Sequence, residues 1–132
     1  VAGLDYRLGW SHVSNLIIII ASVVLLVGYA LYAEVLRENV YLSRVVEVQE
    51  DQRVIDTGLY SIVRHPMYFA VALLYLAIPL VLGSWWALLV MSPCIFLLIV
   101  RIKNEEQVLR GGLPGYTEYT KRVRYRMIPW VW

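Results

Sequence analysis

The chain has 132 residues, of which 60% are hydrophobic, and it carries a formal net charge of +2. This apolar content, with a mean hydropathy of +0.62, is higher than an ordinary soluble domain carries. The basic residues lie beside apolar segments, so we interpret them as signals of membrane orientation and expect no nucleic-acid partner. The composition therefore indicates a single-domain integral membrane protein, residues 1–132.

The chain has one cysteine, Cys94, which lies inside an apolar run. A single cysteine cannot form an intrachain disulfide, and no set of cysteines and histidines has the spacing of a metal site. We therefore expect no bound metal. The chain starts at Val1 without the basic segment and cleavage site of a signal peptide, so we expect none within these residues.

The first membrane span is predicted for residues 13–33. This stretch is apolar apart from two serines and one asparagine, and about 20 residues rising 1.5 Å each cross a hydrocarbon core of roughly 30 Å. Helical composition continues past the span with charged residues, so we expect the helix to end near Asn39. Residues 1–12 are mixed and include aromatic residues suited to a membrane interface.

A polar segment, residues 40–66, follows the first span. Residues 46–49 alternate in polarity and residues 50–52 have the composition of a turn, which permits either a short hairpin or an extended strap. Asp56, Thr57 and Gly58 then predict a turn that leads into a short helix through Val63.

The longest uncharged run extends from Met67 to Val100. About 34 residues are too many for one span, and Gly83-Ser84 lies at the midpoint. We therefore predict two helices, residues 67–82 and 85–101, joined as a tight antiparallel hairpin, with Pro66 at the entry to the first of them.

Charged residues return after the hairpin, at a spacing that continues the third helix into water. A glycine-rich stretch, residues 111–115, must break that helix. Residues 116–122 can form a further short helix. The basic and aromatic end of the chain, residues 124–132, is suited to lying on a membrane surface.

The predicted fold class is therefore an all-α integral membrane protein with three transmembrane helices, a polar connecting segment and a C-terminal short helix. Three spans place residues 34–66 and 101–132 on one side, together with eleven of the twelve Lys and Arg residues. By the positive-inside rule that side faces the cytoplasm. We expect a site where the polar segments 40–66 and 102–132 meet.

Three groups of residues converge at that site because the second and third helices form a hairpin. Arg64, His65 and Tyr68 come from the entry to the hairpin, and Glu105 and Glu106 come from its exit. Each has an ordinary interpretation as well. The arginine could anchor to lipid headgroups, and the glutamates could form surface pairs with nearby basic residues.

The order of these groups is more specific than any one of them. The chain reads Gly-x-Tyr-x-x-Val-Arg-His-Pro-Met-Tyr from Gly58, then an uncharged hairpin, then Asn-Glu-Glu-x-x-Leu from Asn104, then Gly-Tyr-x-x-Tyr from Gly115. This order resembles the isoprenylcysteine carboxyl methyltransferase family of membrane methyltransferases, which includes relatives of phospholipid N-methyltransferases. The resemblance runs from about Leu36 to Trp132.

The resemblance implies a membrane enzyme that binds S-adenosylmethionine and releases S-adenosylhomocysteine. It also implies that the two motifs and the later tyrosines surround this cofactor. The implied cofactor-binding residues are Tyr60, Arg64, His65, Pro66, Met67, Tyr68, Glu105, Glu106, Leu109, Tyr116 and Tyr119. A carboxylate can accept hydrogen bonds from the hydroxyls or the ammonium of such a ligand, and aromatic faces can receive its adenine or its sulfonium.

The methyl acceptor is expected to be lipophilic or a small membrane-accessible molecule, and its class stays open. A carboxylate acceptor would need a cation, for which Arg124 or Arg126 is the first candidate and Arg44 or Arg53 the second. An amine would need a base, which Glu105, Glu106 or His65 could supply. Arg124, Arg126 and Glu106 are thus the predicted catalytic residues.

Two other functions fit parts of the sequence. A membrane reductase of the sterol-reductase type would use NADPH, although the chain lacks the Gly-x-Gly-x-x-Gly fingerprint. A non-catalytic module would bind lipid headgroups or a partner helix and would depend on the basic C-terminus. The methyltransferase interpretation is the first hypothesis because it accounts for both motifs.

Overall fold

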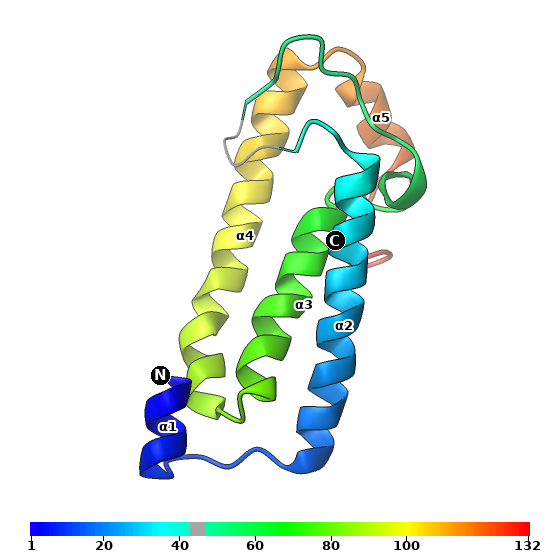
Figure 1. Ribbon diagram of the computed structural model, residues 1–132. Coiled ribbons are helices and arrows are strands. Elements are labelled where there is room, and N and C mark those ends of the chain that lie inside the picture. Colours follow the sequence, from blue (N-terminus) through cyan, green and yellow to red (C-terminus); the bar gives the residue numbers. More distant parts are fainter. Residues whose placement is uncertain (43–46) are drawn as a thin grey trace.

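The computed structural model describes residues 1–42 and 47–132 and is an elongated helical bundle (Figure 1). The described residues contain α-helices and one 3-10 helix, η1, and no strand. In chain order the elements are α1 (Ala2–Leu8), α2 (Asn15–Glu38), η1 (Gly58–Ser61), α3 (Pro66–Val81), α4 (Trp85–Gly112) and α5 (Tyr116–Arg122). The predicted all-α class is confirmed.

Helix α3 lies between α2 and α4, and the three run side by side along the bundle (Figure 1). Two of them, α2 and α4, are long and apolar enough to cross a membrane. The third, α3, is apolar but has 16 residues, so it extends about 24 Å, less than the roughly 30 Å of a hydrocarbon core. The described residues therefore contain two candidate spans, and a third span through α3 stays a prediction.

The helix boundaries follow local signals in the sequence. Pro66 occupies the first turn of α3, where its missing N–H costs nothing. The hydroxyl of Ser84 accepts a hydrogen bond from the Ala87 N–H at 3.0 Å and so caps α4. Between these helices Gly83 adopts a φ of 72°, which a glycine tolerates without steric cost. The predicted tight hairpin is confirmed, with its turn at residues 82–84.

Helix α1 was not predicted, because its residues are of mixed character. It is fixed to the α3–α4 turn by a buried carboxylate. Asp5 is 1% exposed and accepts hydrogen bonds from the Ser11 N–H at 2.7 Å and the Ser11 hydroxyl at 2.6 Å. The Ser84 hydroxyl also donates to it. This contact closes the end of the bundle opposite to the polar segments (Figure 1).

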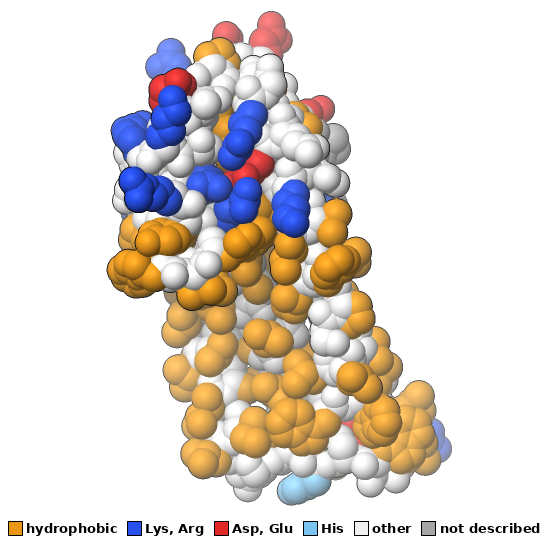
Figure 2. Space-filling view, turned by 180° about the vertical axis from the view of Figure 1, so that it is seen from behind, with side chains coloured by type: hydrophobic (Ala, Val, Ile, Leu, Met, Phe, Trp, Pro, Cys, Tyr) orange, Lys and Arg blue, Asp and Glu red, His pale blue; other side chains and the backbone are white. Residues whose placement is uncertain are grey.

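The outside of the bundle is apolar over most of its length. Hydrophobic side chains cover the shaft in Figure 2, whereas Lys and Arg side chains gather at one end. Large exposed residues such as Leu16 and Ile19 of α2 and Leu89 and Phe96 of α4 belong to this surface. An apolar surface of this extent is typical of contact with lipid, so the chain is a membrane protein.

Two buried clusters hold the polar end together. One joins α3, α4 and the C-terminal segment and consists of Tyr68, Ala72, Leu98, Ile102 and Met127. The other surrounds α5 and consists of Leu113, Tyr116, Tyr119 and Val123, with Val48, Val54 and Leu109 packed against it. Segments far apart in the sequence therefore meet at one end of the bundle.

Candidate functional site

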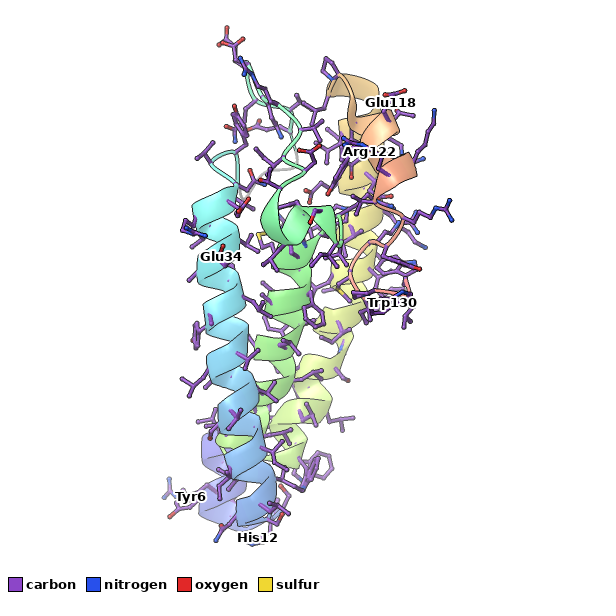
Figure 3. The ribbon with its side chains drawn as sticks, turned by 90° about the vertical axis from the view of Figure 1, so that its right-hand side faces the viewer. Tyr6, His12, Glu34, Glu118, Arg122 and Trp130 are labelled. Carbon is purple, nitrogen blue, oxygen red and sulfur yellow. The ribbon has the colours of Figure 1, made fainter. Side chains whose placement is uncertain are left out.

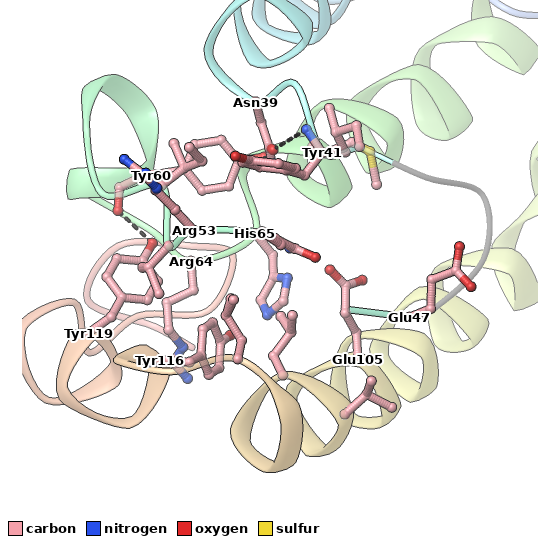
Figure 4. A pocket seen from close by; sticks show the side chains of 18 of the residues that line it. Asn39, Tyr41, Glu47, Arg53, Tyr60, Arg64, His65, Glu105, Tyr116 and Tyr119 are labelled. Carbon is pink, nitrogen blue, oxygen red and sulfur yellow. Dashed lines mark hydrogen bonds between the residues drawn. The ribbon is translucent and has the colours of Figure 1, made fainter. Parts of the chain in front are cut away.

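A pocket lies at the polar end of the bundle, where the connecting segment, the start of α3, the end of α4 and α5 meet (Figure 4). Its volume is about 80 Å³, well above the roughly 10–15 Å³ that one water molecule occupies by this measure. The predicted site residues that line it are Tyr60, Arg64, His65, Met67, Tyr68, Glu105, Leu109, Tyr116 and Tyr119. The structure therefore brings nine of the predicted residues together.

The Arg64–His65 pair is positioned through its backbone. The Arg64 N–H donates to the Tyr125 carbonyl at 3.0 Å, and the His65 N–H donates to the Arg126 carbonyl at 2.7 Å. His65 also precedes Pro66, which disfavours a helical backbone at His65, and His65 has a φ of −128° and a ψ of 59°. The C-terminal segment thus fixes the direction of both side chains.

Glu106 is the centre of a buried charge network. One of its oxygens, Oε1, lies 2.7 Å from both Nε and Nη2 of Arg64 and 3.3 Å from Nε2 of His65. The other oxygen, Oε2, accepts from Nε of Arg126 at 3.0 Å and lies 3.7 Å from Nη2 of Arg110. Both carboxylate oxygens are therefore engaged by cations or by an imidazole.

The burial of Glu106 has a chemical consequence. Residues 101–112 of α4 carry charges and extend past its uncharged stretch, and Glu106 is only 3% exposed there. Burial alone would raise the pKa of Glu106, but hydrogen bonds from His65, Arg126 and Arg64 outweigh it and lower the pKa to about 2. Glu106 is thus an ionised carboxylate and a weak base at neutral pH.

Arg64 uses its remaining donors on backbone oxygens. Its Nη1 donates to the Val123 carbonyl at 2.8 Å and to the Arg124 carbonyl at 2.7 Å. The guanidinium therefore joins α4 to the chain after α5. Arg64 is 7% exposed and is held in place by these bonds, so it forms a fixed part of the pocket wall.

Glu105, the neighbour of Glu106, faces the pocket instead. Successive residues of an α-helix point about 100° apart, so the two glutamates of the pair separate. The Tyr68 hydroxyl donates to Oε2 of Glu105 at 2.5 Å, and Nε of Arg101 donates to the same hydroxyl at 2.9 Å. The Glu105 carboxylate therefore lies at the pocket wall, and the Tyr68 hydroxyl holds one of its two oxygens.

Three tyrosines form an aromatic wall. The Tyr119 hydroxyl donates to the Tyr60 carbonyl at 2.6 Å, and Asn39 Nδ2 donates to the Tyr60 hydroxyl at 2.9 Å. The rings of Tyr116 and Tyr119 have centroids 5.7 Å apart. Burial raises the pKa of Tyr60 to about 12 and the pKa of the other two still further. All three are therefore neutral phenols with a proton to donate.

The hydroxyl of Tyr116 differs from the other two. Among the described residues it is the buried side-chain polar atom that has no hydrogen-bond partner, and its residue is 4% exposed. An unpaired buried hydroxyl costs free energy, of the order of 1–3 kcal/mol. Because Tyr116 lines the pocket, a ligand there can supply the missing partner.

The connecting segment forms a further wall, which includes Arg53, predicted above as a second-choice cation. Gln52, Arg53, Val54 and Ile55 line the pocket, as does Glu47. The described residues 47–57 contain no strand and form no hairpin among themselves. The turn predicted for residues 50–52 is present, because the Gln52 N–H donates to the Gln49 carbonyl at 3.2 Å. Neither the alternation nor the turn composition indicated which side chains would reach the pocket. Arg44, predicted as a second-choice cation, lies outside the described residues.

A close approach between α2 and η1 holds this segment in place. The Thr57 hydroxyl donates to Oε2 of Glu38 at 2.7 Å. Gly58 follows with a φ of 53°, and a Cβ there would lie 2.5 Å from Oε1 of Glu38. A φ in this region favours glycine, and Gly58 begins η1, whose Tyr60 lines the pocket.

Four predicted site residues do not line the pocket. Pro66 is buried at the start of α3, and Glu106 lies behind the wall that Arg64 and His65 form. Arg126 is held by Glu106, and its guanidinium lies 5.2 Å from the ring centroid of Trp132. Arg124 has an exposed side chain, and its carbonyl accepts from Arg64.

Most of the chain matches a known protein family. A sequence model of the family described as phospholipid methyltransferase matches residues 16–112. The matched range extends from the first turn of α2 to the end of α4, so it includes both Arg64-His65 and Glu105-Glu106. A search of curated proteins found no match.

Proposed function

Because the chain belongs to the phospholipid methyltransferase family, we propose that it transfers a methyl group from S-adenosylmethionine to a lipophilic or small membrane-accessible acceptor. The family is one of methyltransferases, which confirms the resemblance seen in the motifs. A nicotinamide-dependent reductase gains no support from this match.

The main support for the proposal is that most of the motif residues line one pocket. The same pocket also contains a buried hydroxyl that has no hydrogen-bond partner. S-adenosylmethionine has an amino-acid head, a ribose diol, an adenine and a sulfonium, and it supplies an already activated methyl group when bound. The lining fits such a molecule, because it combines the Glu105 carboxylate, the tyrosine rings and the Tyr116 hydroxyl. We expect these groups to hold the cofactor.

Each lining group has a distinct part in the proposal. Glu105 accepts hydrogen bonds from ligand hydroxyls or an ammonium, since one side of its carboxylate is already held by Tyr68. The rings of Tyr60 and Tyr119 offer aromatic faces. Tyr116 donates a hydrogen bond, because burial keeps its hydroxyl protonated. Holding both reactants in line is the main contribution that a protein makes to such a transfer.

Glu106 has a positioning part in this proposal. Its two oxygens are engaged by Arg64, His65 and Arg126, and its low pKa makes it a poor proton acceptor. It therefore keeps the Arg64–His65 wall in place. If the acceptor is an amine, Glu105 or His65 is the better candidate for the base, because both line the pocket.

A carboxylate acceptor would call for a different residue. Arg53 lines the pocket, whereas Arg124 and Arg126 do not. Within this proposal Arg53 is therefore the first candidate to hold an acceptor carboxylate, and the two C-terminal arginines are second. The charge distribution supports a cytoplasmic pocket, since eleven of the twelve basic residues lie within residues 34–66 and 101–132, at the end of the bundle that holds it.

The test is methyl transfer by the purified protein in lipid nanodiscs, with S-adenosylmethionine labelled in its methyl group. Acceptors are offered as three classes: prenylated thiol-acids, amine lipids and small thiols. We expect label to move into one class, to be lost with Glu105→Gln, and to be kept with Glu118→Gln, a glutamate that lies outside the pocket lining with a 70% exposed side chain. Binding of the cofactor without transfer to any class would contradict the proposed activity.

A further inference from the structure

The C-terminal loop, residues 125–132, presents large apolar side chains to the outside of the molecule. Trp130 is 84% exposed and Val131 is 74% exposed, and Ile128 beside them is also exposed. Trp130 has a φ of 61°, a backbone conformation that is costly for a bulky residue. The fold therefore holds an aromatic side chain outward at an energetic cost.

The loop has a defined conformation, because its base is packed against the bundle. Met127 is buried in the cluster with Tyr68 and Ile102. The carbonyl of Trp132 accepts hydrogen bonds from the backbone N–H groups of Arg126, Met127 and Ile128 at 2.9–3.0 Å. The exposed side chains are thus carried by a closed loop.

The position of the loop matches a membrane interface. Figure 3 places Trp130 beside the bundle, nearer to its middle than Arg122 and Glu118 of α5 are. In Figure 2 the Lys and Arg side chains gather directly beyond the hydrophobic shaft. Tryptophan prefers the headgroup level of a bilayer, where an apolar region meets a charged one. Trp130 lies at such a boundary on this molecule.

The charge next to the loop is net positive. Residues 116–132 contain Lys121, Arg122, Arg124 and Arg126 but one acidic residue, Glu118, which gives a net charge of 4 − 1 = +3. Arg122 is paired with Asp56 at 2.8 Å, and Arg126 with Glu106 at 3.0 Å. Lys121 lies 3.9 Å from Glu118, but both of these side chains are exposed, and the Arg124 side chain is exposed as well. Lys121 and Arg124 are therefore the ones best placed to meet an external anion.

We propose that this loop is an anchor for a membrane leaflet with anionic headgroups. Ile128, Trp130 and Val131 enter the interface, and Lys121 and Arg124 contact lipid phosphates. The apolar side chains suit any bilayer, whereas the positive charge adds a preference for anionic lipid. The anchor is independent of the methyl transfer proposed above, because it depends on the outer surface of the loop.

The same segment supports the pocket. The carbonyls of Tyr125 and Arg126 hold the Arg64 and His65 N–H groups, and the Arg126 side chain holds Glu106. The segment thus carries lipid contacts on one side and the pocket wall on the other. A lipid-bound loop would restrict the motion of that wall.

The experiment places a fluorescent label on the loop of the full chain. Val131→Cys is made with Cys94→Ala, so that the label has one site, and is attached to an environment-sensitive nitrobenzoxadiazole dye. The protein is incorporated into nanodiscs of phosphatidylcholine alone or of equal parts phosphatidylcholine and phosphatidylglycerol. A second protein carries the dye at Glu118→Cys on α5, whose exposed side chain provides the reference for water.

We expect blue-shifted emission and quenching by spin-labelled lipid for the dye at 131, both stronger with phosphatidylglycerol, and neither for the dye at 118. Lys121→Gln with Arg124→Gln should lower the ratio of inserted to water-exposed dye by about fivefold for each charge. The matched control Arg37→Gln, an exposed arginine paired with Glu34 on α2, should leave the ratio unchanged. Equal emission at 131 and 118, or equal insertion in both lipid mixtures, would overturn the proposal.

Discussion

Replacing Glu106 with glutamine tests the charge network behind the pocket. The substitution keeps the shape of the side chain and one hydrogen-bond acceptor but removes the charge. Arg64, whose side chain is 5% exposed, then lacks its ionic partner. It retains the Val123 and Arg124 carbonyls as acceptors at 2.8 and 2.7 Å, so the loss should be partial.

The magnitude follows from the burial of both partners. Breaking a buried pair by removing one charge costs about 3–5 kcal/mol, and the retained acceptors place Glu106→Gln near 3 kcal/mol at the lower end of that range. An exposed pair costs about 0–1 kcal/mol. The exposed pair Glu118–Lys121, 3.9 Å apart, therefore provides the matched control as Glu118→Gln.

The assay is reversible unfolding in detergent micelles, followed by circular dichroism at neutral pH. We expect Glu106→Gln to lose about 3 kcal/mol of unfolding free energy and Glu118→Gln to be close to wild type. The transferred label or the bound ligand should also decrease for Glu106→Gln, because Arg64 and His65 lose their support. Equal unfolding free energies for the two variants would refute the idea that Glu106 organises this end.

Three further outcomes are expected. The pKa of Glu106 is lowered from 4.5 to about 2 in the folded chain. Its contribution to stability is therefore present above pH 4.5 and is lost as the pH falls toward 2. The unfolding free energy of Glu106→Gln should lack this loss between pH 4.5 and about 2 in an acid titration. Tyr116→Phe should raise the unfolding free energy of the ligand-free chain by about 1–3 kcal/mol, because it removes a buried hydroxyl that has no partner. It should also raise the dissociation constant for S-adenosylhomocysteine about 2- to 12-fold in a calorimetric titration, and an unchanged constant would remove Tyr116 from the site. Asp5→Ala should cost about 1–3 kcal/mol of unfolding free energy, because it leaves the Ser11 and Ser84 donors without their acceptor. Ligand affinity should stay constant, since Asp5 lies at the end of the bundle opposite to the pocket. A loss of affinity would contradict this independence.

Local signals in the sequence predicted the elements that lie near the pocket. A proline fixes its own φ, so Pro66 marked the start of α3, and the glycine-rich stretch at residues 111–115 marked the end of α4. The short helix at residues 116–122 was predicted with the bounds that the structure has. These features depend on neighbouring residues alone.

Contacts between distant residues could not be predicted in the same way. Asp5 and Ser84 are 79 positions apart, and nothing in the local composition of either indicates the other. The two glutamates at 105 and 106 illustrate a second limit. Adjacent in sequence, they point to the pocket and to the charge network respectively, and that rotation is set by how α4 packs against α3.

The connecting segment shows a third limit. Its composition permitted both a hairpin and a strap, because alternation over a few residues does not specify a partner strand. The structure places Arg53 and Ile55 at the pocket, and the segment that carries them is joined to α2 by the hydrogen bond from Thr57 to Glu38. Such a contact depends on the packing of α2 against the rest of the bundle.

The measurement that tests the account most directly is a calorimetric titration of the purified protein with S-adenosylmethionine, S-adenosylhomocysteine and NADPH. We expect saturable binding of both adenosyl compounds with a one-to-one ratio and no heat from NADPH beyond dilution. Binding of NADPH alone, or of none of the three by protein whose helical circular dichroism is intact, would contradict the assignment of the pocket to a methyl donor.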